Sequence, residues 1–256
     1  MFKGWFKKGG KDADAILPAN GLVNDWSFLG ADMHSHFIPG IDDGSPNLET
    51  SIGLIRSMMD MGYNTIITTP HIMIDLYPNT PETINKGLEI LNNGLRESGI
   101  NLTVKAAAEY FVDEYFISRL ANEPLLTITG KEVLIEFSMY SEPPMLKEVI
   151  FKMITSGYRP ILAHPERYSY FHNNFDRFID FKDRGCLMQL NLLSLSGYYG
   201  QTIKKVAEDL LSKSLYDYCG SDVHHDKHTA AIKAMIGTKA GSLLENYPFL
   251  NKKLCF

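Results

Sequence analysis

The chain has 256 residues, of which 45 % are hydrophobic and 21 % charged, the balance of a globular protein long enough to bury a sizeable core. Its net charge is −5 and no basic stripe runs along it, which argues against nucleic acid as a partner. Three cysteines without a C-x-x-C motif support neither a disulfide framework nor a zinc ribbon.

Short runs of strand-forming residues alternate with amphipathic helical patterns along the whole chain. In order, the sequence predicts strand 29–33, helix 48–61, strand 65–69, helix 81–98, strand 103–108, a short helix near 113–121, strand 133–137, helix 145–156, strand 160–163, helix 175–184, strand 187–191, helix 203–212, strand 216–220 and helix 230–236. Capping signals agree with these bounds, because Thr80 and Pro81 open one helix and Gly62, Gly157 and Gly185 follow others.

The alternation of strand and helix predicts an α/β fold with parallel strands joined by crossover helices. The pattern fits an open sheet as well as a closed barrel, and the chain length favours a barrel of about seven units. We expect a single domain at residues 26–256, preceded by a tail at residues 1–25. With no signal sequence and no apolar run of the ~20 residues that a membrane span needs, we expect a cytoplasmic protein.

Histidines and carboxylates gather at the C-terminal ends of the predicted strands. They are His34 and His36 after the first strand, His71 after the second, Glu109 after the third, Glu136 at the end of the fourth, His164 after the fifth, and Asp222 and His224 after the seventh. In a parallel barrel these strand ends meet on one face, where active sites form. Residues that are distant in sequence are therefore predicted to converge on one site.

Taken singly, most of these motifs have a plain structural interpretation as well. His34 and His36 lie on one side of an extended segment, a spacing that suits one metal ion. Asp43, in an Asp-Asp-Gly run, is either a further ligand or part of an ordinary turn. His71 is either a ligand or a packed histidine, and Glu109 is either a ligand or an exposed loop acid.

Glu136 gives a sharper signal than these residues, whereas Arg167 leaves two interpretations open. Glu136 interrupts an apolar strand, where a buried glutamate needs a partner. Arg167 either faces a phosphate, for which its planar fork is suited, or forms a surface salt bridge with Glu166. His225 and His228 are expected to be solvent-exposed extras.

Nine candidate ligands are too many for one zinc ion, but they suit two or three metals with bridging carboxylates. Such sites suit the hydrolysis of phosphate esters, because several metals can activate water and stabilise charged oxygens. The sequence has no G-x-S-x-G elbow, no P-loop and no cysteine in a phosphate-cradling loop. A metal-dependent phosphatase is therefore the favoured hypothesis.

The segments 32–45, 68–71, 134–137, 162–168 and 221–224 together resemble the PHP (polymerase and histidinol phosphatase) superfamily. More narrowly, they resemble its bacterial tyrosine-protein phosphatases of capsule and exopolysaccharide operons. The resemblance implies a distorted (β/α)7 TIM-like barrel with three divalent transition metals, for which manganese is expected and iron or zinc are alternatives. The metal ligands that it implies are His34, His36, Asp43, His71, Glu109, Glu136, His164, Asp222 and His224.

The resemblance also implies that Arg167 binds phosphate and that the substrate is a phosphotyrosine protein, expected to be the tail of a bacterial tyrosine kinase that controls polysaccharide export. Our hypothesis is direct attack by a metal-bound hydroxide, with His224 or Asp222 aiding proton transfer to the leaving phenolate. A small-molecule phosphatase of the histidinol-phosphate type and a catalytically degenerate regulatory barrel are the alternatives. After His224 the relatives often have an arginine that helps to hold phosphate, whereas this loop reads His225-Asp226-Lys227-His228; whether Lys227 replaces that arginine is left open.

Overall fold

The computed structural model describes residues 22–255, so most of the expected tail at residues 1–25 lies outside the described residues. The strands are β1 (Ala31–Asp32), β2 (Thr65–Thr68), β3 (His71–Ile72), β4 (Val104–Ala106), β5 (Glu109–Phe111), β6 (Glu132–Glu136), β7 (Arg159–Ala163), β8 (Leu187–Asn191) and β9 (Tyr218–Gly220). The α-helices are α1 (Leu48–Asp60), α2 (Pro81–Glu97), α3 (Glu114–Asn122), α4 (Leu146–Thr155), α5 (Asp176–Asp183), α6 (Leu192–Ser196), α7 (Gln201–Ser212), α8 (Asp226–Ala234) and α9 (Lys239–Glu245). Short 3-10 helices cover Pro165–Arg167, Ser169–Phe171 and Asn251–Leu254.

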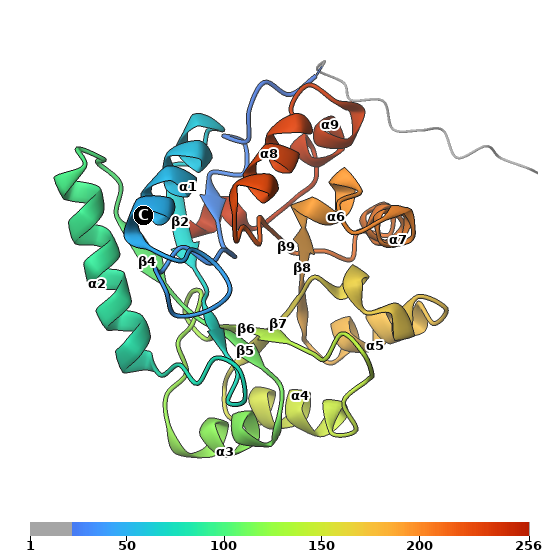
Figure 1. Cartoon of the computed structure of the whole chain (residues 1–256). Helices are drawn as coiled ribbons and strands as arrows, with labels where there is room; N and C mark the ends of the chain where they lie inside the picture. The colour runs from blue at the N-terminus through green and yellow to red at the C-terminus, as the bar shows by residue number, and fades with distance from the viewer. Residues whose placement is uncertain (1–21, 256) are drawn as a thin grey trace, which may run out of the picture.

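The strands pair in parallel, as predicted, and form two sheets with the orders β1-β2-β4 and β3-β5-β6-β7-β8-β9. A parallel bridge between Ser35 and Val223 joins the segments that follow β1 and β9. The helices lie around the outside of the strands (Figure 1). The fold is therefore α/β with parallel sheets, whose first and last strands are brought side by side.

Two predicted strands are interrupted in the structure. His71 and Glu109 follow the second and third predicted strands, as expected, but each also begins a further short strand. The predicted strand 65–69 ends at Thr68, and the predicted strand 103–108 ends at Ala106; His71 and Glu109 then begin the separate strands β3 and β5. Pro70 lies at the first break, and it has no N–H with which to continue a ladder. Its carbonyl instead accepts a hydrogen bond from the Glu109 amide, at 3.1 Å.

Both faces of the strands are buried, as their continuous apolar sequences predict. Along β6, Val133 and Ile135 belong to the large cluster that packs against the helices. Leu134 between them points the other way, into a second cluster with Ile161 from the adjacent strand β7 and Ile67 from β2 of the other sheet. This inner cluster packs between the strands and so holds in place the strand ends that carry the polar side chains.

Helix α2 packs very closely against the loop that follows β1. A Cβ atom added at Gly87 would lie 2.4 Å from Cγ2 of Ile38, closer than carbon atoms can approach. Ile38 itself is fully buried. The glycine therefore lets α2 support the loop that carries His36 and Asp43.

This contact gives a stability prediction. Gly87→Ala should lower the free energy of unfolding by about 1–3 kcal/mol, because the added methyl overpacks a rigid contact. Gly53→Ala is the matched control: Gly53 is exposed in α1, and its added Cβ would meet nothing within 4 Å. That control should gain roughly 0.5–1 kcal/mol from helix propensity. Urea unfolding measures both, and equal shifts in the two variants would show that α2 does not depend on this close approach.

Candidate metal centre

The nine residues predicted as metal ligands lie together. Their donor atoms form four overlapping groups, and within each group the atoms lie within 4.8 Å of one another. The groups are His36, Asp43, His71 and His224; His34, His36 and Asp222; His34, Glu109 and His164; and His71, Glu109 and Glu136. Since several residues belong to two groups, the donors form one continuous cluster.

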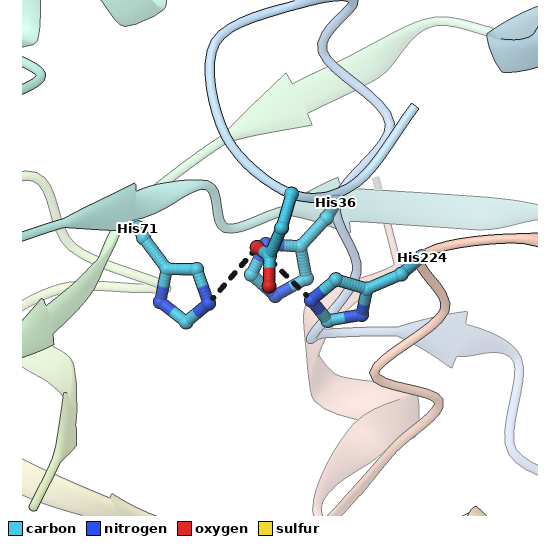
Figure 2. Close-up of side chains that lie close together, drawn as sticks. His36, His71 and His224 are labelled. Atoms are coloured by element: carbon cyan, nitrogen blue, oxygen red, sulfur yellow. Dashed lines mark ion pairs between the residues drawn. The ribbon is translucent and has the colours of Figure 1, made fainter. Parts of the chain in front are cut away.

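Asp43 brings one carboxylate to three histidines from different parts of the chain. Its Oδ1 lies 3.5 Å from Nε2 of both His71 and His224, and Figure 2 shows His71 and His224 on either side of His36. The rings of His36 and His224 stack with centroids 3.9 Å apart. The Asp43 side chain is 51 % exposed whereas that of His36 is buried, so Asp43 closes the cluster on its solvent side.

Glu109 lies at the buried centre of the cluster. Its Oε2 is 3.2 Å from Nε2 of His34 and 3.2 Å from Nδ1 of His71, and its Oε1 is 3.2 Å from Nε2 of His164. Glu109 Oε2 and His71 Nδ1 are nevertheless buried without a hydrogen-bond partner, because the contact between them is poorly aligned. Buried polar atoms of this kind are costly when left unpaired, and a shared cation would satisfy both of them.

The carboxylates of the site and the ionisation of His164 also fit cations. One cavity of about 330 Å3 is lined by four carboxylates, those of Asp43, Glu109, Glu136 and Asp222. Among the described residues, Arg167 is the only lysine or arginine that lines it. Burial, aided by the nearby Arg167, lowers the pKa of His164 to about 4. A neutral imidazole is the form that binds a metal, so His164 is ready to coordinate. The donor set therefore fits divalent metals that accept both nitrogen and oxygen ligands.

A second layer of side chains orients the histidines, and sequence reasoning missed it. Nδ1 of His34 pairs with Oε1 of Gln189 at 2.9 Å, and Nδ1 of His36 pairs with Oδ2 of Asp42 at 2.8 Å. In both rings Nε2 is thereby left to face the cluster. The detectable signal was Gln189 itself, a fully buried amide within the apolar strand β8.

The backbone is strained at two of the candidate ligands. His164 has φ 33° and Asp222 has φ 52°, and Ser214 is the only other non-glycine residue with positive φ in the described chain. Such conformations cost of order 1–3 kcal/mol each and cluster at functional sites. The fold therefore uses some of its stability to aim these two side chains.

The support of His34 gives a prediction about metal affinity. Gln189→Leu removes the acceptor for His34 Nδ1, so the apparent affinity for metal should fall about 10–100-fold. Competition with a chromogenic chelator measures that affinity. Gln201→Leu, the same change at an exposed position that begins α7, should leave it unchanged. If the two variants bind metal equally well, Gln189 does not orient a ligand.

Comparison with known proteins identifies the family of the chain. The family model described as "Capsular polysaccharide synthesis, CpsB/CapC" matches residues 30–239, which include all nine candidate ligands. The chain belongs to the CpsB/CapC family. This confirms the resemblance that the sequence motifs indicated.

The chain is also similar to named phosphatases and to a solved structure. The chain is 29 % identical over 218 residues to the tyrosine-protein phosphatase YwqE of Bacillus subtilis, covering 83 % of this chain and 86 % of that one. It is 27 % identical over 200 residues to the tyrosine-protein phosphatase CpsB of Streptococcus pneumoniae, covering 76 % and 82 %. A solved structure, from a study of YwqE and CpsB as metal-dependent tyrosine phosphatases, superposes with a TM-score of 0.76 at 27 % identity, covering 87 % and 90 %.

In this chain the Arg167 side chain contacts the donor cluster and does not form the salt bridge with Glu166 that was the alternative. Its Nη1 donates to Oδ2 of Asp222 at 3.1 Å, and its guanidinium carbon lies 4.4 Å from the centre of the Tyr199 ring. Glu166, the alternative partner, is fully buried and accepts hydrogen bonds from the Asn191 amide and from the Tyr216 hydroxyl. These contacts rule out the alternative of a Glu166–Arg167 surface salt bridge.

The loop after His224 also differs from expectation. His225 is exposed, as predicted, but the prediction that His228 is exposed was wrong, since it is only 7 % exposed. Helix α8 begins at Asp226 and turns His228 back, so that its Nδ1 accepts a hydrogen bond from the His224 amide at 3.2 Å. Both His225 and His228 line the cavity, whereas Lys227 is exposed and is not among the lining residues.

Proposed function

We propose that this chain is a metal-dependent protein-tyrosine phosphatase. The observation that carries the proposal is the meeting of nine metal-type donors in one cluster, seven of which line, together with Arg167, one cavity of about 330 Å3. A multinuclear cation site provides charge for phosphate oxygens, and an arginine adds a planar fork that binds them in pairs. The names of the CpsB and YwqE relatives as tyrosine-protein phosphatases support phosphotyrosine as the group that is hydrolysed.

The proposed cofactors are three divalent transition metals, with manganese expected and iron or zinc as alternatives. The four overlapping donor groups support more than one cation, because no single ion can use all nine ligands. When bound, such metals supply Lewis-acid stabilisation and activate water as the nucleophile. The ligands proposed are His34, His36, Asp43, His71, Glu109, Glu136, His164, Asp222 and His224.

The residues of the chain have separate roles in the proposed reaction. Arg167, whose side chain is 23 % exposed toward the cavity, binds phosphate oxygens and stabilises their charge in the transition state. Asp222 holds Arg167 in place through the 3.1 Å contact. The His224 side chain is more exposed than that of Asp222, at 14 % against 4 %, so His224 is the better placed of the two to assist the leaving phenolate.

The finer points of fold and context are proposals as well. A closed, distorted (β/α)7 barrel over residues 26–256 is supported by the bridge between Ser35 and Val223. The proposed substrate is a tyrosine kinase tail that controls capsule or exopolysaccharide synthesis, in keeping with the family description. We propose a cytoplasmic location; none of the helices in residues 22–255 has both the length and the apolar character to cross a membrane.

The test compares substrate classes. Manganese-loaded protein should hydrolyse a phosphotyrosine peptide with a higher kcat/KM than histidinol phosphate or other phosphorylated metabolites. Greater activity on the metabolites would favour the small-molecule phosphatase. No activity on any of them, in protein that binds no metal, would favour the degenerate regulatory barrel.

A further inference from the structure

The cavity that holds the candidate metal centre has a second, less polar part. Beside the donors and Arg167, its lining includes Met73, Tyr77, Met139 and Tyr199. Metal ions and arginine bind a phosphate, but they do not contact the organic group that the phosphate leaves with. The side chains next to the cluster therefore determine which phosphate esters fit.

Met73 and Tyr77 are held toward the cavity by a tight turn. The Met73 amide donates to the Tyr77 carbonyl at 3.0 Å, and the Tyr77 amide donates to the Met73 carbonyl at 2.7 Å. The Asn79 side chain ties this turn to the rest of the site, because its Nδ2 donates to the carbonyls of both His71 and Ile41 at 2.9 Å. Met73 and Tyr77 are half-buried, so the turn presents a preformed surface rather than a loop that must be ordered on binding.

The ring of Tyr77 lies directly beside the candidate ligands. It stacks on the His71 ring with centroids 5.4 Å apart and an interplanar angle of 15°. If a phosphate ester binds with its phosphate at the cluster, the organic group attached to that phosphate therefore lies beside the Tyr77 ring. Aromatic rings next to one another attract beyond the effect of buried area, in offset or edge-to-face arrangements.

Met139 comes from a different loop, three residues after the end of β6. That loop is held in place by the Tyr170 hydroxyl, which donates to the Ser138 carbonyl at 2.8 Å. Strands β3 and β6 are both neighbours of β5, so the loops that carry Tyr77 and Met139 follow the strands on either side of the one that begins with Glu109. Methionine sulfur makes favourable contacts with aromatic rings and adapts to their shape.

We propose that Met73, Tyr77 and Met139 form an aryl wall, which contacts the ring of phosphotyrosine and makes the site selective for aryl over alkyl phosphates. The proposal rests on the proposed phosphatase function, and it names the residues that set its substrate class. Tyr199 has a different role: its ring lies 4.4 Å from the guanidinium carbon of Arg167 and so positions the phosphate-binding group. A cavity of about 330 Å3 is at the small end of ligand sites, which suits one side chain rather than a folded peptide.

The test measures binding without catalysis. Phenylphosphonate and methylphosphonate carry the same anionic group, are not hydrolysed and differ in the ring. Titration calorimetry with manganese-loaded protein should show phenylphosphonate binding at least about tenfold more tightly. Tyr77→Ala and Met139→Ala should each reduce that ratio several-fold, whereas Tyr77→Phe should keep it.

Leu76→Ala is the matched control, since Leu76 is in the same turn but is 64 % exposed and does not line the cavity; it should leave the ratio unchanged. Met139→Ala guards against an indirect effect of Tyr77→Ala on its neighbour His71. Equal affinity of the wild-type protein for the two phosphonates, or a ratio that neither alanine variant changes, would overturn the aryl wall while leaving the phosphatase proposal intact. Failure of both phosphonates to bind the metal-loaded protein would overturn the phosphatase proposal itself, and the aryl wall with it.

Discussion

Glu109→Gln should reduce the turnover of a phosphotyrosine peptide by roughly a hundredfold or more, and it should reduce the metal bound per chain. The reason is the central position of Glu109, whose two carboxylate oxygens lie 3.2 Å from nitrogens of His34, His71 and His164. An amide removes one negative charge and replaces an acceptor oxygen by an NH2 group that cannot bind a cation. Steady-state kinetics and metal analysis by mass spectrometry on the same sample measure both effects.

The matched control is Glu148→Gln, which makes the same chemical change on the surface of α4. Glu148 forms only a 2.7 Å pair with Lys152, in which both side chains are largely exposed, so activity and metal content should stay as in the wild type. Unfolding curves are needed because Glu109 is fully buried. A correctly folded Glu109→Gln protein with normal metal content and turnover would contradict the role that we assign to Glu109.

Arg167→Ala should lower turnover by about 10²–10³-fold, the usual cost of losing one donor to the charge that develops in a transition state. Bound metal should remain close to the wild-type amount, because Arg167 is not a metal ligand. Arg167→Lys should recover only part of the activity, since an ammonium group is a point charge without the planar fork. The kcat and KM of each variant on a phosphotyrosine peptide provide the measurement.

Arg184→Ala is the control for removal of a positive charge. Arg184 pairs with Asp180 on the surface of the α5 region, at 2.9 Å, and its loss should not affect turnover. Near-normal turnover in Arg167→Ala, with its metal content intact, would show that phosphate is held by other groups. His225 would then be the next candidate, because it lines the same cavity.

The convergence of the donors could be predicted from sequence because it depends on a rule of topology. His34, Glu136 and His164 lie at or just beyond the ends of strands that sequence pattern identifies, and parallel strands bring such ends to one side. The apolar runs of β6, β7 and β8 were long enough to locate to within a residue or two. The pair His34 and His36 could therefore be interpreted as metal ligands because of the order of the strands around it.

Other features depend on contacts that a linear pattern does not contain. The pairing of His34 with Gln189 joins residues 155 positions apart, and it required the register between strands. The burial of His228 depends on where α8 begins, four residues before the predicted start at 230. The short strands β3 and β5, of two and three residues, are too brief to carry a periodic signal.

The most direct test of the metal-dependent mechanism is the turnover of a phosphotyrosine peptide while Mn2+ is titrated into metal-free protein and the bound ions are counted. We expect negligible turnover without metal and a rise to a plateau as about three ions bind per chain. Full turnover by metal-free protein, or no turnover once the cluster is filled, would contradict that mechanism.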